Sequence, residues 1–248
     1  MQCANRLGSL GWLGGKCVRL IFFILFLTAI FRHVPTVGGY TLVEVAFFFL
    51  TYNIVDILAQ LFFRGIYMIG RDIREGDMDF YLVQPINPLF RIASNLVDFL
   101  DFLTLIPVLV VMGFVLPQAF KNLDLVQSFT RMSLYLLLCV NGVVIAFSVH
   151  VAIASLTVRT QQMENTIWLY RDFMSLGRFP TDVYPAVLQY VLTFALPIAV
   201  MVSIPTKALI GIISLNTILS ALAISAAWLY LSIQMWKSSL KHYCSVSS

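Results

Sequence analysis

Long runs of apolar residues constrain this chain more than any other feature. Residues 132–158 and 209–235 contain no Asp, Glu, Lys or Arg, and about 20 apolar residues are enough for a helix to cross the hydrocarbon core of a bilayer. Only 11% of the 248 residues are charged, whereas a soluble domain has about 25%. A membrane β-barrel would instead show alternating segments of about ten residues. The sequence therefore predicts an all-α membrane protein.

Six apolar segments predict six transmembrane helices in a single transmembrane domain covering residues 1–248. The predicted spans lie at about residues 10–31, 40–63, 96–116, 132–158, 161–179 and 209–235. The first span must begin before Val18, because the 14 residues from 18 to 31 are too few for a core of roughly 30 Å. Lys16 and Arg19 are therefore expected to snorkel toward the inner headgroups.

Two segments compete for the fifth span. Residues 161–179 carry charges such as Arg171 and Asp172 among aromatic residues, which suits a helix packed inside a bundle or lying in the interface. Residues 186–204 are more apolar but contain Pro197. Either choice gives six spans, and the residues alone leave both open.

Basic residues predict the orientation, because cytoplasmic loops of membrane proteins are enriched in Lys and Arg. With the N-terminus inside, ten basic residues lie on the inner side and four on the outer side, while Arg171 and Arg178 are unplaced. The inner ten are Arg6, Lys16, Arg19, Arg64, Arg71, Arg74, Arg91, Arg159, Lys237 and Lys241, and the outer four are Arg32, Lys121, Arg131 and Lys207. We therefore predict that both termini are cytoplasmic. The net charge of +4 reflects this topology and predicts no nucleic-acid partner.

Residues 64–91 form a charged insert between apolar spans. They contain eight of the chain's 28 charged residues, so this segment leaves the membrane and meets water or a partner. Gly76 permits a tight turn or a close approach of backbones. Phe80, Tyr81 and Leu82 can fill a pocket of a partner, as aromatic anchors do at interfaces. The alternative is a solvated loop whose aromatic side chains snorkel to the membrane.

Asp56 is the main candidate inside the predicted spans, with Tyr52 and Asn53 on the same helical face. An ionisable group at that depth is a functional candidate because leaving it in lipid costs several kcal/mol. His150, in the fourth span, is a possible partner of Asp56 or a proton carrier. The structural alternatives are a neutral or hydrogen-bonded Asp56 at a helix or subunit interface, and a His150 that only makes a packing hydrogen bond.

Two further carboxylates, Asp98 and Asp101, lie near the inner surface in this topology. We expect them to pair with Arg64 or Arg91 on the charged insert. Such ion pairs would have a structural role only.

Motifs for chemistry are missing from the sequence. It has no phosphate-binding G-x-x-x-x-G-K-[ST] loop, no H-E-x-x-H and no G-x-S-x-G. The four cysteines, Cys3, Cys17, Cys139 and Cys244, show neither close pairing nor the spacing of a metal site. We predict a protein that is not an enzyme, without catalytic residues, a bound metal or a cofactor of its own.

The charged insert resembles a segment of a known family. GRDIREGDMDFYLVQPINPLFRIAS, residues 70–94, resembles the cytoplasmic segment of type-2 ATP-binding-cassette (ABC) exporter permeases, in an uncharacterised bacterial branch. Residues 74–90 carry the most specific part of the motif. Residues 177–211, with their aromatic-Pro, Tyr-Pro and later Pro pattern, and WKSSLKHYCSVSS at 236–248 are similar to other parts of the family. The likeness covers nearly the whole chain, although the lead-in before the first span is shorter than in relatives.

The resemblance implies a permease subunit of an ABC exporter in the bacterial inner membrane. Two such subunits, identical or homologous, would form the pathway in contact with membrane lipid. A separate ABC ATPase subunit would use the ATP and dock on the insert. It further implies that residues 161–179 are the fifth span and that 186–204 are re-entrant or interfacial. The implied coupling residues are Arg71, Asp72, Arg74, Glu75, Gly76, Asp77, Asp79, Phe80 and Tyr81.

Two alternatives to the exporter remain open at this point. One is a secondary transporter or channel in which Asp56 and His150 form a midplane ion site. The other is a membrane scaffold that transports nothing. The cargo of an exporter is open too, because an apolar pathway suits many lipids, peptides and drugs.

Overall fold

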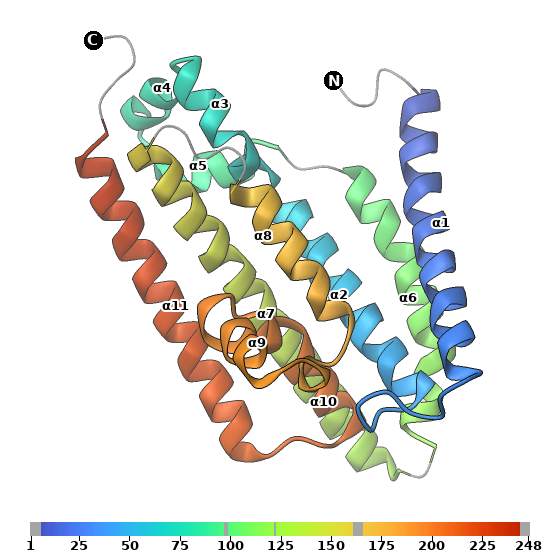
Figure 1. The fold of residues 1–248 in the computed structure, drawn as a ribbon. Helices are drawn as coiled ribbons and strands as arrows, with labels where there is room; N and C mark the ends of the chain where they lie inside the picture. Colours follow the sequence, from blue (N-terminus) through green and yellow to red (C-terminus); the bar gives the residue numbers. More distant parts are fainter. Residues whose placement is uncertain (1–5, 97–98, 122, 161–165, 244–248) are drawn as a thin grey trace.

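The computed structural model describes residues 6–96, 99–121, 123–160 and 166–243, which form helices and no β-strand (Figure 1). Five helices are long and apolar enough to cross a membrane, and a bent pair of shorter ones would make a sixth crossing if it counts as one span. The prediction of an all-α, multi-pass membrane protein is confirmed.

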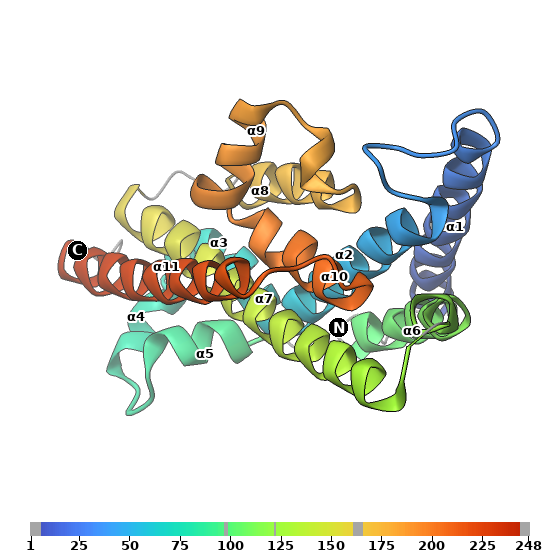
Figure 2. The same ribbon diagram turned by 90° about the horizontal axis from the view of Figure 1, so that it is seen from below.

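The long helices stand side by side. Seen from below, α11 (Leu215–Lys241), α7 (Leu125–Thr160), α2 (Leu42–Phe63) and α6 (Phe99–Ala119) follow one another across the molecule (Figure 2). The fifth, α1 (Arg6–Phe31), lies beside α6 at one end of this series. The main hydrophobic core lies between these helices. The first turn of α1 and the last turn of α11 lie at the same end of the molecule (Figure 1).

Local signals set the helix ends. Helix α2 begins with a capping box in which Thr41 and Glu44 satisfy each other's backbone N–H groups. Ser214 caps α11 through the N–H of Thr217. Helix α7 begins at Leu125 rather than near the predicted residue 132. Its 36 residues correspond to about 54 Å, so α7 is longer than a bilayer core and extends beyond it.

The segment predicted as the fifth span, residues 161–179, is short and irregular where the structure describes it, and it is not among the five long apolar helices. Helix α8 (Thr166–Met174) continues as the 3₁₀ turn η3 (Ser175–Arg178), and a further 3₁₀ turn, η4 (Thr181–Val183), follows. Helix α8 buries Ile167, Tyr170 and Met174 against the bundle, while Trp168 and Leu169 on its other side are each 56% exposed. Residues 161–165, the start of the predicted span, lie outside the described residues.

A bent element follows α8. One arm is α9 (Ala186–Tyr190) with the π-helical turn η5 (Val191–Ala195), and the other is the π-helical turn η6 (Ala199–Ser203) with α10 (Ile204–Ile210). The arms meet at 84°, next to Pro197, which has no N–H to continue a helix. Residues 186–204 are thus one apolar run in sequence but two differently directed helices in space.

The bent element is fixed to its surroundings at both ends. Near its start, Asp182 binds Nζ of Lys207 at 2.8 Å and accepts a hydrogen bond from the Tyr40 hydroxyl at 2.5 Å. At its end, Arg131 donates to the Ile210 carbonyl at 3.2 Å. In between, Gly142 of α7 lets the two backbones approach, since a Cβ there would come within 2.7 Å of the Met201 carbonyl oxygen.

The close approach at Gly142 predicts a stability effect. Gly142→Ala should lower the thermal unfolding midpoint of the detergent-solubilised chain, because the new methyl meets backbone atoms that cannot rotate away, an overpacking that costs about 1–3 kcal/mol. The matched control is Gly113→Ala in α6, where an added Cβ meets nothing within 4 Å; it should not lower the midpoint. Equal midpoints for the two variants would contradict the close packing of α7 on η6.

Candidate functional site

The charged insert folds into a cluster of short helices. After α2 the chain forms the 3₁₀ turn η2 (Arg64–Met68), then α3 (Ile69–Arg74), α4 (Asp77–Val83) and α5 (Pro88–Ser94). We call α3–α5 the platform. Gly76 joins α3 to α4 with φ +80°, a left-handed conformation that costs other L-residues roughly 1–2 kcal/mol. At α5, Asn87 caps the N-terminus beside Pro88.

The platform has its own hydrophobic core and is seated on two long helices. Its buried residues are Ile69, Ile73, Met78, Tyr81, Ile92 and Ala93, which pack with Ile66 of η2, Val151, Ala154 and Val158 of α7, and Trp236 of α11. Gly65 of η2 lies so close to α5 that a Cβ would overlap the Ile92 carbonyl oxygen. The C-terminal half of α7 thus supports the platform, and the charged insert is a folded unit rather than a loose loop.

Two of the nine predicted coupling residues point into the platform. Asp72 is 1% exposed and Tyr81 is 8% exposed, and the Tyr81 hydroxyl donates to the Asp72 carboxylate at 3.4 Å. Arg71 pairs with Asp72 at 3.2 Å, and Asn95 donates to the Tyr81 hydroxyl at 3.1 Å. Asp72 and Tyr81 therefore hold the platform together instead of facing a partner.

A contact near the C-terminal end of the described chain also fixes the platform. The hydroxyl of Tyr243 donates a hydrogen bond to Asp79 at 3.0 Å. Burial raises the pKa of Tyr243 to about 12, and the hydrogen bond to Asp79 adds to the rise. The phenol therefore remains a protonated donor at neutral pH.

The outer surface of the platform combines apolar and charged side chains. Phe80 is 65% exposed, and Leu82, Val83, Ile86 and Phe90, which follow it closely in the chain, are exposed as well. We call these five residues the Phe80 patch. Arg71, Arg74 and Glu75 are exposed on the neighbouring helix and turn. Single exposed apolar residues are normal on protein surfaces, but several in one short folded segment with charges beside them favour an interaction site.

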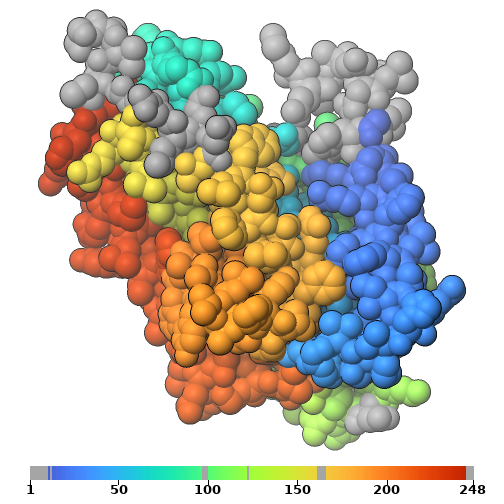
Figure 3. Space-filling view, in the orientation of Figure 1, coloured from blue at the N-terminus to red at the C-terminus, as the bar shows by residue number. Residues whose placement is uncertain are grey.

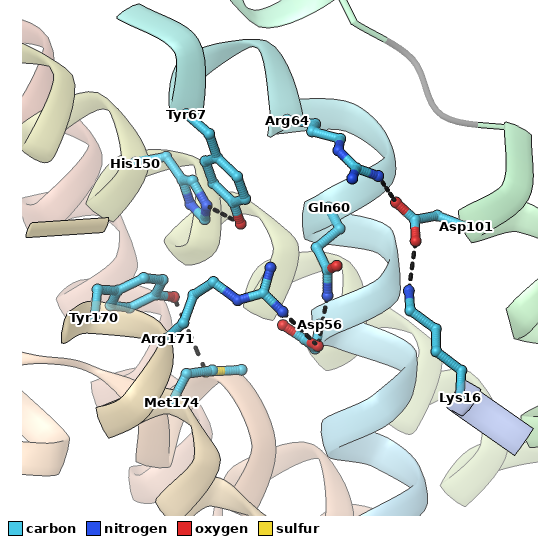
Figure 4. A network of polar contacts seen from close by, with 10 residues as sticks. All are labelled: Lys16, Asp56, Gln60, Arg64, Tyr67, Asp101, His150, Tyr170, Arg171 and Met174. Carbon is cyan, nitrogen blue, oxygen red and sulfur yellow. Dashed lines mark hydrogen bonds and ion pairs between the residues drawn. The ribbon is translucent and has the colours of Figure 1, made fainter. Parts of the chain in front are cut away.

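Within the bundle, Asp56 is the centre of a polar network (Figure 4). It is buried and accepts a hydrogen bond from Gln60, one turn along α2, at 2.7 Å. Arg171 of α8 approaches it to 4.0 Å. The guanidinium of Arg171 also lies 5.9 Å from the ring centres of Tyr67 and Trp168. The negative charge of Asp56 is therefore compensated by Arg171 of α8. The sequence alone could not assign this arginine to either side of the membrane.

The other three candidates in the bundle have separate partners. Tyr52 faces Arg178, whose guanidinium lies 5.3 Å from the Tyr52 ring centre. Asn53 donates to the Phe49 carbonyl at 2.7 Å. The two ring nitrogens of His150 contact the Ala146 carbonyl at 2.6 Å and the Tyr67 hydroxyl at 3.2 Å. His150 is therefore occupied by packing hydrogen bonds, and the structure does not pair it with Asp56.

Asp101 of α6 is fully buried between two cations (Figure 4). It binds Arg64 at 3.0 Å, as predicted, and Nζ of Lys16 at 2.5 Å. The expectation that Lys16 snorkels to the inner headgroups was wrong, because this buried carboxylate lies within its reach. Asp98 lies outside the described residues.

These charged groups surround a cavity of about 670 Å³ between α1, α2 and α8, which we call the basic cavity. It is lined by Gly15, Lys16, Arg19, Tyr52, Gln60, Arg64, Trp168, Arg171, Asp172, Ser175 and Arg178. The surface is hollowed between the first helix and α8 (Figure 3). The sequence analysis missed this cavity, although one signal was available: the mixture of charged and aromatic residues in 161–179.

The fold and these sites define the class of protein. It is a multi-pass helical membrane protein with a folded platform at one end and a charged cavity between α1, α2 and α8. The family model of the ABC-2 family transporter proteins matches residues 17–247, so the chain belongs to this family and the resemblance of residues 70–94 is confirmed. The family is the membrane component of transporters, is generally not catalytic itself and normally works with an ABC ATPase. The search of curated proteins gives no match.

The arrangement around Asp101 predicts a stability effect. Asp101→Asn should destabilise the chain by about 1–3 kcal/mol, because it leaves two cations without their shared carboxylate in a partly buried place. Thermal unfolding in detergent measures this. Lys16→Met combined with Asp101→Asn should recover part of the loss.

The control for that experiment is Glu75→Gln, which removes a carboxylate from an exposed pair with Arg71. Such surface pairs contribute about 0–1 kcal/mol, so its unfolding midpoint should stay near that of the wild type. An Asp101→Asn variant as stable as Glu75→Gln would mean that Lys16 and Arg64 do not depend on Asp101.

Proposed function

We propose that this chain is the permease subunit of an ABC exporter. It forms the translocation pathway as a dimer with a second permease subunit, identical or homologous, in the bacterial inner membrane. Both termini and the platform lie in the cytoplasm, where a separate ABC ATPase subunit docks and uses the ATP. The chain itself binds no cofactor. Family membership supports the class, and the exposed Phe80 patch on a firmly seated platform is the observation that carries the docking.

The platform has the chemistry of a docking element. Phe80 is a large aromatic side chain held in an exposed position by a helix whose opposite face is buried in the platform core. Such preorganised aromatic residues, surrounded by polar groups, provide most of the binding energy at many interfaces. Exposed Arg71, Arg74 and Glu75 supply charges for specificity and register. Asp72 and Tyr81 serve as internal supports rather than contacts.

The seating of the platform supplies a route for motion. Its core packs on α7 and α11, and η2 joins it directly to α2 with Gly65 against α5. A movement of the platform therefore changes the packing of three long helices together. Closure of an ATPase pair on binding ATP would favour one arrangement of these helices, and access would switch from inside to outside as a shift between populations.

Truncating the anchor tests the docking. Phe80→Ala should weaken binding of the ABC ATPase that co-purifies with the wild-type chain by about 30-fold, since an anchor residue contributes about 2 kcal/mol. Quantitative co-purification in mild detergent measures it. The matched control is Phe102→Ala, an exposed phenylalanine of α6, which should leave binding unchanged. Retention of the ATPase by Phe80→Ala, or its absence from the wild type, would refute docking through this patch.

The conformation of Gly76 tests whether platform shape matters. Gly76→Ala should reduce transport-coupled ATP hydrolysis severalfold, because alanine disfavours φ +80° by about 1–2 kcal/mol. An added Cβ meets nothing within 4 Å, so Gly76→Ala changes the backbone preference at this position without a steric clash. Gly76→Asn, which tolerates left-handed backbone, should retain more coupling than Gly76→Ala. If Gly76→Ala couples ATP hydrolysis to transport as well as Gly76→Asn does, coupling does not depend on the left-handed backbone at residue 76.

The secondary-transporter alternative receives less support from the geometry. Asp56 contacts Gln60 and Arg171, whereas His150 contacts Tyr67 and Ala146. The two residues have separate partners and do not form one ion site. Transport that stops when the ion gradient is collapsed, with no ATPase requirement, would favour that alternative over an exporter.

A further inference from the structure

The basic cavity carries more positive than negative charge. Its lining includes five cations, Lys16, Arg19, Arg64, Arg171 and Arg178, against one carboxylate, Asp172. Two more carboxylates lie behind the wall: Asp101 is shared by Lys16 and Arg64, and Asp56 faces Arg171. Among the residues that the structure describes, these five positive charges against three negative ones leave an excess of two. In a partly dehydrated site this excess attracts an anion more strongly than it would in water.

Arg178 is the least compensated cation at depth. It is half-buried at the end of η3 and lies over two rings, 5.3 Å from the centre of Tyr52 and 6.0 Å from that of Phe23. Tyr52 is near the middle of α2, so Arg178 sits about halfway along the bundle. Among the described residues it forms no ion pair with a carboxylate. Ring contacts offset part of the cost of an arginine at this depth, and charged residues held there usually mark a substrate or ion pathway.

Arg19 is the second cation of the cavity that forms no ion pair with a carboxylate among the residues that the structure describes, although its charge acts on Asp56 from a distance. It stands exposed on α1, on the opposite wall of the cavity from α8. Arg19 and Arg178 thus line one space from two elements far apart in the sequence. Their placement suits a ligand that lies between α1 and α8 and carries negative charge.

An apolar strip continues from the charged part of α1. Phe22 and Phe26, three and seven residues after Arg19, share its helical face and are 67% and 51% exposed. A space of about 670 Å³ is within the range of roughly 300–1,000 Å³ typical of small-molecule sites. Charge beside an apolar strip is the pattern that an amphiphile matches, with its headgroup on the cations and its chain along the phenylalanines.

We propose that the basic cavity binds the anionic headgroup of an amphiphilic cargo, with Arg19 and Arg178 as its direct contacts. Asp56 and Gln60 hold Arg171 in place beside them. The assignment as cargo rests on the proposed exporter function. The binding itself does not, so it can be measured on the full chain alone, without ATPase or transport.

The test is binding of short-chain phospholipids to the purified chain, measured by the shift of the thermal unfolding midpoint with ligand concentration. Dihexanoylphosphatidic acid should bind at least tenfold more tightly than dihexanoylphosphatidylcholine, whose headgroup has no net charge. Arg19→Gln and Arg178→Gln should each lose at least tenfold in affinity for the phosphatidic acid. The matched control is Arg32→Gln, an exposed arginine beyond the other end of α1, which should bind as the wild type does.

Several results would overturn the proposal. Equal affinity for the two lipids, or unchanged affinity in both cavity variants, would exclude an anionic headgroup site. Inorganic phosphate that binds as tightly and with the same dependence on Arg178 would mean a free anion in place of an amphiphile. If Arg178→Gln does not fold, Arg178→Lys keeps the charge and must retain most of the binding. If no ATPase co-purifies with the wild-type chain, the proposed exporter function is contradicted, but the lipid-binding results still test the cavity on their own.

Discussion

Burying charge away from water costs several kcal/mol unless a partner compensates it, and this constraint accounts for most of the specific contacts in the bundle. Asp101 binds Lys16 and Arg64 and so ties α1 to α6 and to the end of α2. Asp56 ties α2 to α8 through Arg171. Apolar helix surfaces can pack against many other apolar surfaces, so apolar packing alone does little to select neighbouring helices. These charged pairs select particular neighbours.

The same constraint separates two kinds of site. On the platform, charged side chains remain in water, and the apolar side chains divide into an inner core and an exposed patch around Phe80. In the basic cavity the reverse holds, since cations line an interior space and the apolar strip of α1 lies beside it. A partner protein suits the first arrangement, and an amphiphilic anion suits the second.

The two sites are linked by the elements that carry them. Helix α2 brings Tyr52 and Gln60 to the basic cavity and continues through η2 into the platform. Helix α7 supports the platform at one end and packs against the bent element through Gly142. The platform and the wall of the cavity are therefore connected through packed helices.

The amino-acid sequence by itself determined the class, the positions of the five long apolar helices and the platform motif, because these depend on local composition. Runs without charge demand a bilayer, and residues 74–90 carry a family pattern that the comparison with family models confirmed. Contact between distant side chains was decided only by the tertiary structure. It turned Tyr81 and Asp72 inward, paired Asp56 with Arg171 instead of His150, and drew Lys16 to Asp101. The reason is physical: a charged or aromatic side chain takes whichever partner folding brings within reach, and no spacing along one helix reveals what another helix will place opposite it.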